Sequence, residues 1–190
     1  MAFQITKRTS KIIATVFALA IIVAAGSGYH HKTKPRHFLT VTPGVFYRSA
    51  YLRPDNLEKV LERYKIKTVV NLIGQDNPEK KTRLQNERRI CREKGVKLVE
   101  MPMPVETPPT PDQLSAWLAL LDSVEDHPIL VHCMHGVVRT GMMAAVYEIE
   151  YLNKNNEEVL SGLPMFGHDL YMPKRKPMRD FILGYRKKTE

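Results

Sequence analysis

The chain contains 190 residues, 43% of them hydrophobic, and carries a formal net charge of +9 at pH 7. This length fits one domain with a hydrophobic core, and the composition excludes a collagen, a coiled coil, a wholly disordered chain and a disulfide-rich scaffold. The basic charge suits anionic partners such as phosphoesters or acidic lipid head groups, and a solvated surface explains it equally well.

An uncharged apolar segment, Ile12–Tyr29, follows a short basic stretch at the amino terminus. Its length lies between that of a membrane-spanning helix and that of the apolar region of a secretory signal. We expect residues 1–29 to form a hydrophobic helix that anchors the chain, with a cleaved signal peptide as the alternative because small residues occur at Val23–Gly26. The preceding basic residues favour the cytoplasmic side, which predicts an exported domain. Residues 30–44 are expected to be a basic linker.

In a bacterium, this topology predicts a single N-terminal pass through the inner membrane with the folded domain in the periplasm. Cleavage of the segment would instead leave a secreted or periplasmic protein. The sequence does not specify whether the segment is cleaved.

Alternating apolar runs and helical periodicities follow the linker. Residues with high strand propensity on both sides of Pro43-Gly44 predict a hairpin. Apolar spacing predicts a helix over Arg53–Ile66 and then a buried strand over Lys67–Gly74. A charged helix over Pro78–Gly95 and a strand within Val96–Pro104 complete this half of the chain.

The second half begins with a capping-box signal, Thr110 followed by Gln113, for a helix. A strand over Pro128–Cys133 and a helix from about Thr140 come next. Two further helices are expected within segments 155–163 and 176–188. Because strands alternate with helices, we expect an α/β fold in which a small, mostly parallel sheet is flanked by helices.

The stretch Val131–Gly141 places Cys133 at the end of a strand, Gly136 in a loop and Arg139 at the start of a helix. Such a loop directs backbone N–H groups and a helix amino terminus at one point, which makes an anion site. Arg139 adds a bidentate fork for two phosphate oxygens. The same positive field favours the thiolate of Cys133, which is the nucleophilic form. The predicted chemistry is attack of sulfur on phosphorus, a cysteinyl-phosphate intermediate and hydrolysis by water.

The sequence HCMHGVVRTG resembles the His-Cys-x5-Arg-Ser/Thr signature of the cysteine-dependent protein tyrosine and dual-specificity phosphatases. Similarity to their compact bacterial, plant and fungal members runs from about Val45 to beyond Tyr151. The resemblance implies a phosphatase domain over residues 45–190 that needs no metal ion or organic cofactor.

The resemblance also implies site residues. It makes Cys133 the nucleophile and Arg139 a phosphate ligand, with Thr140 assisting hydrolysis of the intermediate and His132 supporting the loop. The residues expected to surround the phosphate are Met134, His135, Gly136, Val137, Val138 and Arg139.

The chain departs from the family pattern in two places. Relatives that act on inositol pyrophosphates are often lysine-rich in the variable loop positions, whereas Met134, His135, Val137 and Val138 stand there in this chain, which argues against such a substrate. The aspartate that serves these phosphatases as a general acid is also missing. We expect Glu106 to replace it rather than Asp112, because Asp112 already complements a helix dipole.

Other reactive residues have simpler explanations. Cys91 is expected to be a half-buried packing thiol, with a resolving partner for Cys133 as the less favoured role. A metal site formed by Cys133, His132 and His135 lacks a second ligand pair. We expect His168-Asp169 to form a turn rather than to line a cleft. The basic run at residues 173–181 is expected to be a solvated surface, with recruitment of an acidic substrate or a membrane as the alternative.

The sequence therefore predicts a membrane-anchored, exported cysteine phosphatase that acts on a phosphomonoester. Phosphotyrosine on a protein is the first choice of substrate, and a phosphoinositide or another lipid phosphate is the second. A phospho-binding pseudophosphatase is a rival from another class, and a sulfurtransferase is a weaker one. No nucleic-acid partner is expected, and the oligomeric state is open.

Overall fold

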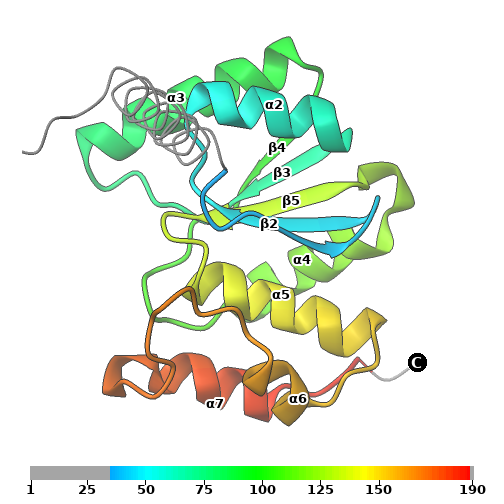
Figure 1. The fold of residues 1–190 in the computed structure, drawn as a ribbon, viewed down its shortest axis with the longest axis vertical. Helices are drawn as coiled ribbons and strands as arrows, with labels where there is room; N and C mark the ends of the chain where they lie inside the picture. Colours follow the sequence, from blue (N-terminus) through cyan, green and yellow to red (C-terminus); the bar gives the residue numbers. More distant parts are fainter. Residues whose placement is uncertain (1–34, 189–190) are drawn as a thin grey trace, which may run out of the picture. The chain divides into compact units, whose positions relative to one another are not determined.

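A five-stranded sheet runs through the part of the chain that the computed structural model describes, residues 35–188 (Figure 1). The strands, in sheet order, are β1 (Leu39–Thr42), β2 (Phe46–Ala50), β5 (Ile129–Cys133), β3 (Thr68–Asn71) and β4 (Lys97–Glu100). All neighbours pair in parallel except β1 and β2, which are antiparallel. The α/β class with a mostly parallel sheet is confirmed, and the edge strand makes the sheet mixed.

Strand β1 lies inside the stretch 30–44 that composition assigns to a linker, and the compact unit begins at Pro35. Apolar packing explains why residues 35–44 are folded. The ring of Phe38 lies 4.6 Å from that of Tyr64 and 5.8 Å from that of Tyr47. The predicted hairpin at Pro43-Gly44 then connects β1 to β2.

Helices cover both faces of the sheet. Their bounds are α2 (Pro54–Tyr64), α3 (Pro78–Glu93), α4 (Pro111–Asp122), α5 (Val138–Tyr151), α6 (Asn156–Ser161) and α7 (Lys176–Gly184), with short 3₁₀ turns η1 (Val124–Asp126) and η2 (Pro173–Arg175). Figure 1 shows α2 and α3 on one face, α4 and α5 on the other, and α6 and α7 beyond α5. Each helix predicted within these residues is present.

Local sequence signals set two helix starts. Thr110 and Gln113 form the predicted reciprocal capping box at α4, with side chain to backbone hydrogen bonds of 2.9 and 3.2 Å. Asn77 caps α3 by accepting a 2.9 Å hydrogen bond from the backbone N–H of Lys80. These caps satisfy N–H groups that a helix leaves unpaired.

The sheet separates two hydrophobic clusters. The larger one, on the α4 and α5 side, contains Phe46, Trp117 and Met143, and the Trp117 indole donates a 3.0 Å hydrogen bond to the Met143 carbonyl. Cys133 belongs to this cluster, whereas Cys91 belongs to the smaller one beneath α2 and α3. The two thiols therefore pack in different layers. Cys91 is a packing thiol as predicted, but it is buried rather than half-buried.

The predicted membrane segment Ile12–Tyr29 lies outside the described residues, so its helical structure stays a prediction. Between residues 35 and 188, no helix combines the length and the apolar content that a bilayer crossing requires.

Candidate active site

The loop from Cys133 to Val138 is short because β5 ends at Cys133 and α5 begins at Val138. Its turn depends on Gly136, which has a φ of +67°. A Cβ atom on this residue would lie 2.5 Å from the Ala50 nitrogen and 2.6 Å from the Ser49 carbonyl oxygen, so only glycine fits. Because no side chain caps α5, its first N–H groups stay available to an anion at this point.

Cys133 lies at the base of this loop and is 2% exposed. The backbone N–H of Gly136 donates a 3.2 Å hydrogen bond to its sulfur. Burial by itself raises the pKa of the thiol, but the Thr140 hydroxyl, the Arg139 guanidinium and nearby backbone N–H groups outweigh it and lower the pKa below its ordinary value of 9.0. The sulfur is therefore biased toward the thiolate.

The buried Thr140 hydroxyl has no hydrogen-bond partner of standard geometry in the described part of the chain. Its effect on Cys133 is therefore that of a close dipole rather than of an aligned hydrogen bond. A hydroxyl in the first turn of α5, next to the sulfur, is also near any group bound to that sulfur.

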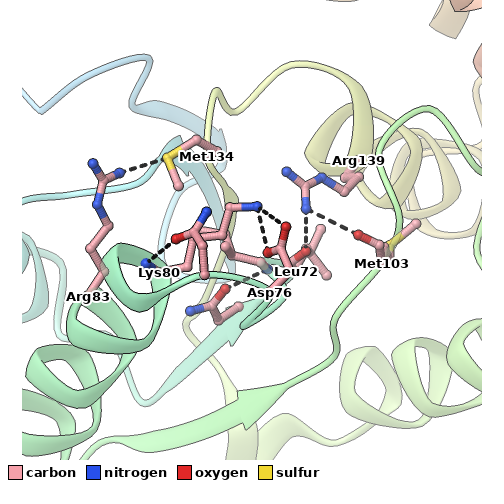
Figure 2. Close-up of polar contacts among 10 residues, drawn as sticks. Leu72, Asp76, Lys80, Arg83, Met103, Met134 and Arg139 are labelled. Carbon is pink, nitrogen blue, oxygen red and sulfur yellow. Dashed lines mark hydrogen bonds and ion pairs between the residues drawn. The ribbon is translucent and has the colours of Figure 1, made fainter.

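Arg139 extends from the first turn of α5 toward the end of β3. One terminal nitrogen donates hydrogen bonds of 2.8 Å to the Leu72 carbonyl and 3.2 Å to the Met103 carbonyl (Figure 2). The other terminal nitrogen and Nε form no hydrogen bond with residues 35–188, and the side chain lines the same pocket as Cys133. The two carbonyls thus fix the guanidinium plane while leaving donors for an oxyanion.

His132 is supported from behind by a buried acid that the sequence analysis did not single out. Its Nε2 lies 2.7 Å from a carboxylate oxygen of Glu87 on α3, and the Asn71 amide donates to the other oxygen. The contact between His132 and Glu87 is an ion-pair contact rather than an aligned hydrogen bond. Burial lowers the pKa of His132, but Glu87 outweighs it and raises the pKa above its ordinary value.

A signal for Glu87 was present in the sequence. It occupies the same face of α3 as the apolar residues Leu84, Ile90 and Cys91, all of which are buried. An acid on an apolar helix face is seldom fully buried unless it is paired. Its partner, however, is on a strand 45 residues later in the chain, as the positions of Glu87 and His132 show.

A pocket of about 270 Å³ opens above the sulfur. It brings together Cys133 and Arg139 with predicted loop residues and with residues from two distant segments. The lining consists of Val105, Glu106, Cys133, His135, Val137, Val138, Arg139, His168, Lys174 and Arg175. Asp112 is absent from this lining and is exposed on the first turn of α4.

Glu106 adopts a left-handed backbone conformation with a φ of +63°, which is unusual for a residue other than glycine. Its carboxylate contacts a guanidinium nitrogen of Arg175 at 3.4 Å. Arg175 is buried, so the expectation of a wholly solvated basic run is wrong at this position. Packing of η2 against the pocket wall removes Arg175 from solvent. Lys174 and Lys176 are exposed as expected, whereas Met178 of the same run is buried in the hydrophobic core.

The pair His168-Asp169 has both of the roles that were weighed. Asp169 forms a turn by accepting a 2.8 Å hydrogen bond from the Tyr171 N–H. His168 lines the pocket, with its ring centroid 6.3 Å from that of His135. The preference for a turn alone is therefore wrong for His168, because this segment reaches the pocket that Cys133 lines.

Arg83 of α3 contacts the loop, and Asp76 lies in the segment before α3. Arg83 donates a 2.9 Å hydrogen bond to the sulfur of Met134, and Asp76 pairs with Lys80 at 2.7 Å (Figure 2). The Lys80 hydrogen bond holds the pKa of Asp76 below its usual value, with a smaller contribution from Arg139. Asp76 is therefore a poor proton donor. Glu106 is the carboxyl group in the pocket lining and remains the candidate for that role.

Among the described residues, no three side chains of His, Cys, Asp or Glu converge in the manner of a metal site. In particular, His132 turns its Nε2 toward Glu87.

The sequence of this chain is similar to those of known phosphatases. A family profile described as "DSP-PTPase phosphatase fused to NAD+ Kinase" matches residues 38–168. Inositol diphosphatase DSP3 of Arabidopsis thaliana is 32% identical over 113 residues, which cover 57% of this chain and 52% of that protein. Dual specificity protein phosphatase TpbA of Pseudomonas aeruginosa (strain UCBPP-PA14) is 31% identical over 105 residues, 55% of this chain and 43% of TpbA. The chain thus matches about half the length of these relatives.

Solved structures give the same fold. The core catalytic domain of the PP-IP phosphatase SIW14 from S. cerevisiae, in complex with citrate, superposes with a TM-score of 0.65 at 26% identity, covering 80% of this chain and 86% of that one. P. aeruginosa TpbA superposes with a TM-score of 0.63 at 24% identity and the same coverage, which is a likeness of fold. The expected phosphatase-type architecture is confirmed.

Proposed function

The chain belongs to the family of dual-specificity-type protein tyrosine phosphatases, and on that premise we propose that it hydrolyses phosphomonoesters through a cysteinyl-phosphate on Cys133. The observation that carries the proposal is the buried sulfur at the base of the loop, 3.2 Å from the Gly136 N–H and with a lowered pKa. A packing thiol such as Cys91 shows the opposite behaviour, since burial raises its pKa to about 12.

In the first step, the phosphate binds to the N–H groups of the loop and to the free donors of Arg139. The Cys133 thiolate then attacks phosphorus in line with the leaving oxygen. An S–P bond forms, the P–O bond breaks, and the leaving oxygen takes a proton from Glu106. Because Glu106 lines the pocket and Asp112 does not, the geometry supports Glu106 as the donor.

In the second step, water attacks phosphorus and breaks the S–P bond, which releases inorganic phosphate and restores the thiolate. Glu106, now a carboxylate, accepts a proton from that water. Thr140 stabilises the sulfur as it departs, because its hydroxyl already lies beside it. No metal ion enters either step.

A protein phosphotyrosine is the substrate that we propose first. The pocket is walled by the valines Val105, Val137 and Val138 beside the sulfur, and such apolar walls suit a flat phenyl ring. The similarity to TpbA, a dual specificity protein phosphatase by name, supports a protein substrate.

A substrate with a second phosphate is the other candidate, and one observation favours it. Lys174, Arg175 and His168 place cationic and imidazole groups on the pocket wall facing the loop, where a neighbouring phosphate would lie. DSP3 and SIW14 are inositol diphosphatases by name. A phosphoinositide head group has the same chemistry and would also suit a membrane-anchored enzyme.

We further propose that residues 1–29 anchor the chain in the inner membrane, with the catalytic domain in the periplasm. Basic residues before the apolar segment support this orientation. A reporter that works only after export, fused after Glu190, should be active. A stable but inactive fusion would contradict the proposed topology.

The substrate is tested by steady-state kinetics of the full chain on a phosphotyrosine peptide, a phosphoserine peptide, an inositol diphosphate and a phosphoinositide. Cys133→Ser serves as the matched control for contaminating phosphatase. Of the four substrates, the phosphotyrosine peptide is expected to have the highest kcat/KM. Phosphate binding without turnover of any substrate would instead identify a pseudophosphatase.

A further inference from the structure

Arg48 is a buried cation in the middle of strand β2. Its side chain is 1% exposed, and no carboxylate within residues 35–188 forms an ion pair with it. One terminal nitrogen donates a 2.9 Å hydrogen bond to the Gly136 carbonyl. Its Nε and its other terminal nitrogen are buried without a partner in this part of the chain. Burying a guanidinium with so few partners lowers the stability of the folded state, and a functional role would explain why it is present.

The sheet register places Arg48 directly beneath the catalytic loop. Ala50 pairs with Cys133 and Arg48 with Val131, so Arg48 and Cys133 project from the same face of the sheet. The first turn of α5 covers this face, since a Cβ atom on Gly141 would lie 3.8 Å from an Arg48 nitrogen. Arg48 is thus enclosed between β2, β5 and α5.

The hydrogen bond to Gly136 orients a peptide unit of the loop. In a trans peptide the carbonyl and the following N–H point in opposite directions. Because the Gly136 carbonyl turns down to Arg48, the N–H of Val137 is directed away from Arg48. The N–H of Gly136 itself already donates to the sulfur of Cys133. Arg48 therefore keeps a carbonyl oxygen out of the anion site and leaves N–H groups around it.

The charge of Arg48 also acts on the sulfur. Burial lowers the pKa of Arg48 to about 10, and the charges of Cys133 and Glu148 oppose that shift. The guanidinium is therefore still charged at neutral pH. Since electrostatic coupling is mutual, a cation that the thiolate stabilises must stabilise the thiolate in turn.

We propose that Arg48 is a positioning residue, which holds the loop in its anion-binding conformation and stabilises the Cys133 thiolate from inside the core. The proposal rests on the proposed function only in taking Cys133 as the nucleophile. Other charged or titratable groups around the sulfur come from β5, α5 and the pocket walls. They are His132, His135, Arg139, Glu106, His168, Lys174 and Arg175.

The test is the pH dependence of Cys133 alkylation by iodoacetamide in the full chain, followed by mass spectrometry of the Cys133 peptide so that Cys91 does not interfere. In Arg48→Met, the midpoint of alkylation should rise by about one pH unit. The acidic limb of kcat/KM should move by the same amount. The control Arg89→Met, which removes an exposed arginine of α3, should leave both unchanged.

Arg48→Lys keeps a cation but not the planar fork. It is the test variant if circular dichroism shows that Arg48→Met does not fold. We expect an intermediate midpoint and several-fold weaker inhibition by inorganic phosphate, because the Gly136 carbonyl is no longer held. A folded variant with the wild-type midpoint and wild-type inhibition would overturn the proposal. If the midpoint moves but the wild-type chain turns over no phosphoester, the proposed function fails and the role of Arg48 stands.

Discussion

The loop that follows β5 and the opposite wall of the pocket are built in different ways. Buried contacts fix the loop, since Gly136 packs on β2 and Arg139 holds two carbonyls. In the wall, Val105 is 64% exposed and Glu106 reaches η2 through a single 3.4 Å contact with Arg175. In the proposed mechanism, transfer of the phosphoryl group to sulfur therefore takes place at a loop fixed by buried contacts, whereas leaving-group protonation and substrate choice depend on a more open wall.

The largest effect is expected in the loop after β5. Cys133→Ser should reduce hydrolysis of p-nitrophenyl phosphate to background while preserving the circular dichroism spectrum, because serine is not ionised at the pH where the thiolate exists. Cys91→Ser is the matched control and should retain wild-type turnover, since Cys91 lies in the other hydrophobic cluster. Near-normal turnover by Cys133→Ser would contradict the mechanism.

Arg139→Lys should cost roughly 10²–10³ in kcat/KM, the usual loss for one preorganised donor at an oxyanion site. Lysine retains the charge but cannot bond to the Leu72 and Met103 carbonyls while presenting a planar fork. Steady-state kinetics on p-nitrophenyl phosphate measures the loss, with Arg89→Lys as the exposed control. If both variants behave alike, the fork has no role in the reaction.

In the open wall, Glu106→Gln should slow alkyl phosphates by about 10² and remove the alkaline limb of their pH–rate profile. Aryl phosphates should be affected far less, because a phenolate leaves without a proton. Asp112→Asn is the control, since Asp112 lies outside the pocket lining. The same pattern in Asp112→Asn alone would transfer the role to Asp112, and its absence from both variants would mean catalysis without a general acid.

A smaller effect is expected at the cationic part of the wall. Lys174→Met should raise KM about tenfold, or about 1.4 kcal/mol, for a substrate with two neighbouring phosphates. The KM for p-nitrophenyl phosphate should not change. Lys176→Met is the matched control, because Lys176 pairs with Asp180 outside the pocket. An equal change in KM for both substrates would show that Lys174 does not select for a second phosphate.

The smallest expected effect is on stability. The pKa of His132 is raised in the folded state, so its contribution is fully present below the ordinary value of 6.5 and is lost as pH rises through the folded value. The free energy of unfolding in urea should therefore decrease as the pH rises above the ordinary value and through the raised pKa of the folded state. Glu87→Gln should flatten this dependence, because the carboxylate that stabilises the imidazolium is gone. An unchanged slope would rule out the pair as its source.

The contrast between the loop after β5 and the opposite wall of the pocket also explains which parts of the site could be predicted from the sequence. The strand, the glycine turn and the helix around Cys133 are encoded within a few residues, so their positions follow from local pattern alone. The capping box at Thr110 is local in the same sense. The helices and strands were predictable because each has its own periodicity and end signals.

The remaining parts of the site depend on contacts between distant segments. Arg175 contacts Glu106, which is 69 residues away in the sequence, and Arg139 donates to the carbonyl of Leu72, which is 67 residues away. No local pattern distinguishes Arg175 from its exposed neighbours in the basic run, and burial alone makes it different. The same holds for Arg48, because nothing in the sequence of β2 indicates the carbonyl that it reaches.

The fit of Gly136 against Ser49 and Ala50 restricts how this protein can diverge or be redesigned. The end of β2 and the loop after β5 pack closely against each other, although more than 80 residues separate them in the sequence. The hydrogen bond between Arg48 and Gly136 joins the same two segments. A chimera that takes the loop from a relative must therefore take the end of β2 from the same parent. In the course of evolution, the two segments are expected to be inherited as a unit, while the wall that carries Glu106 and Arg175 is free to be exchanged.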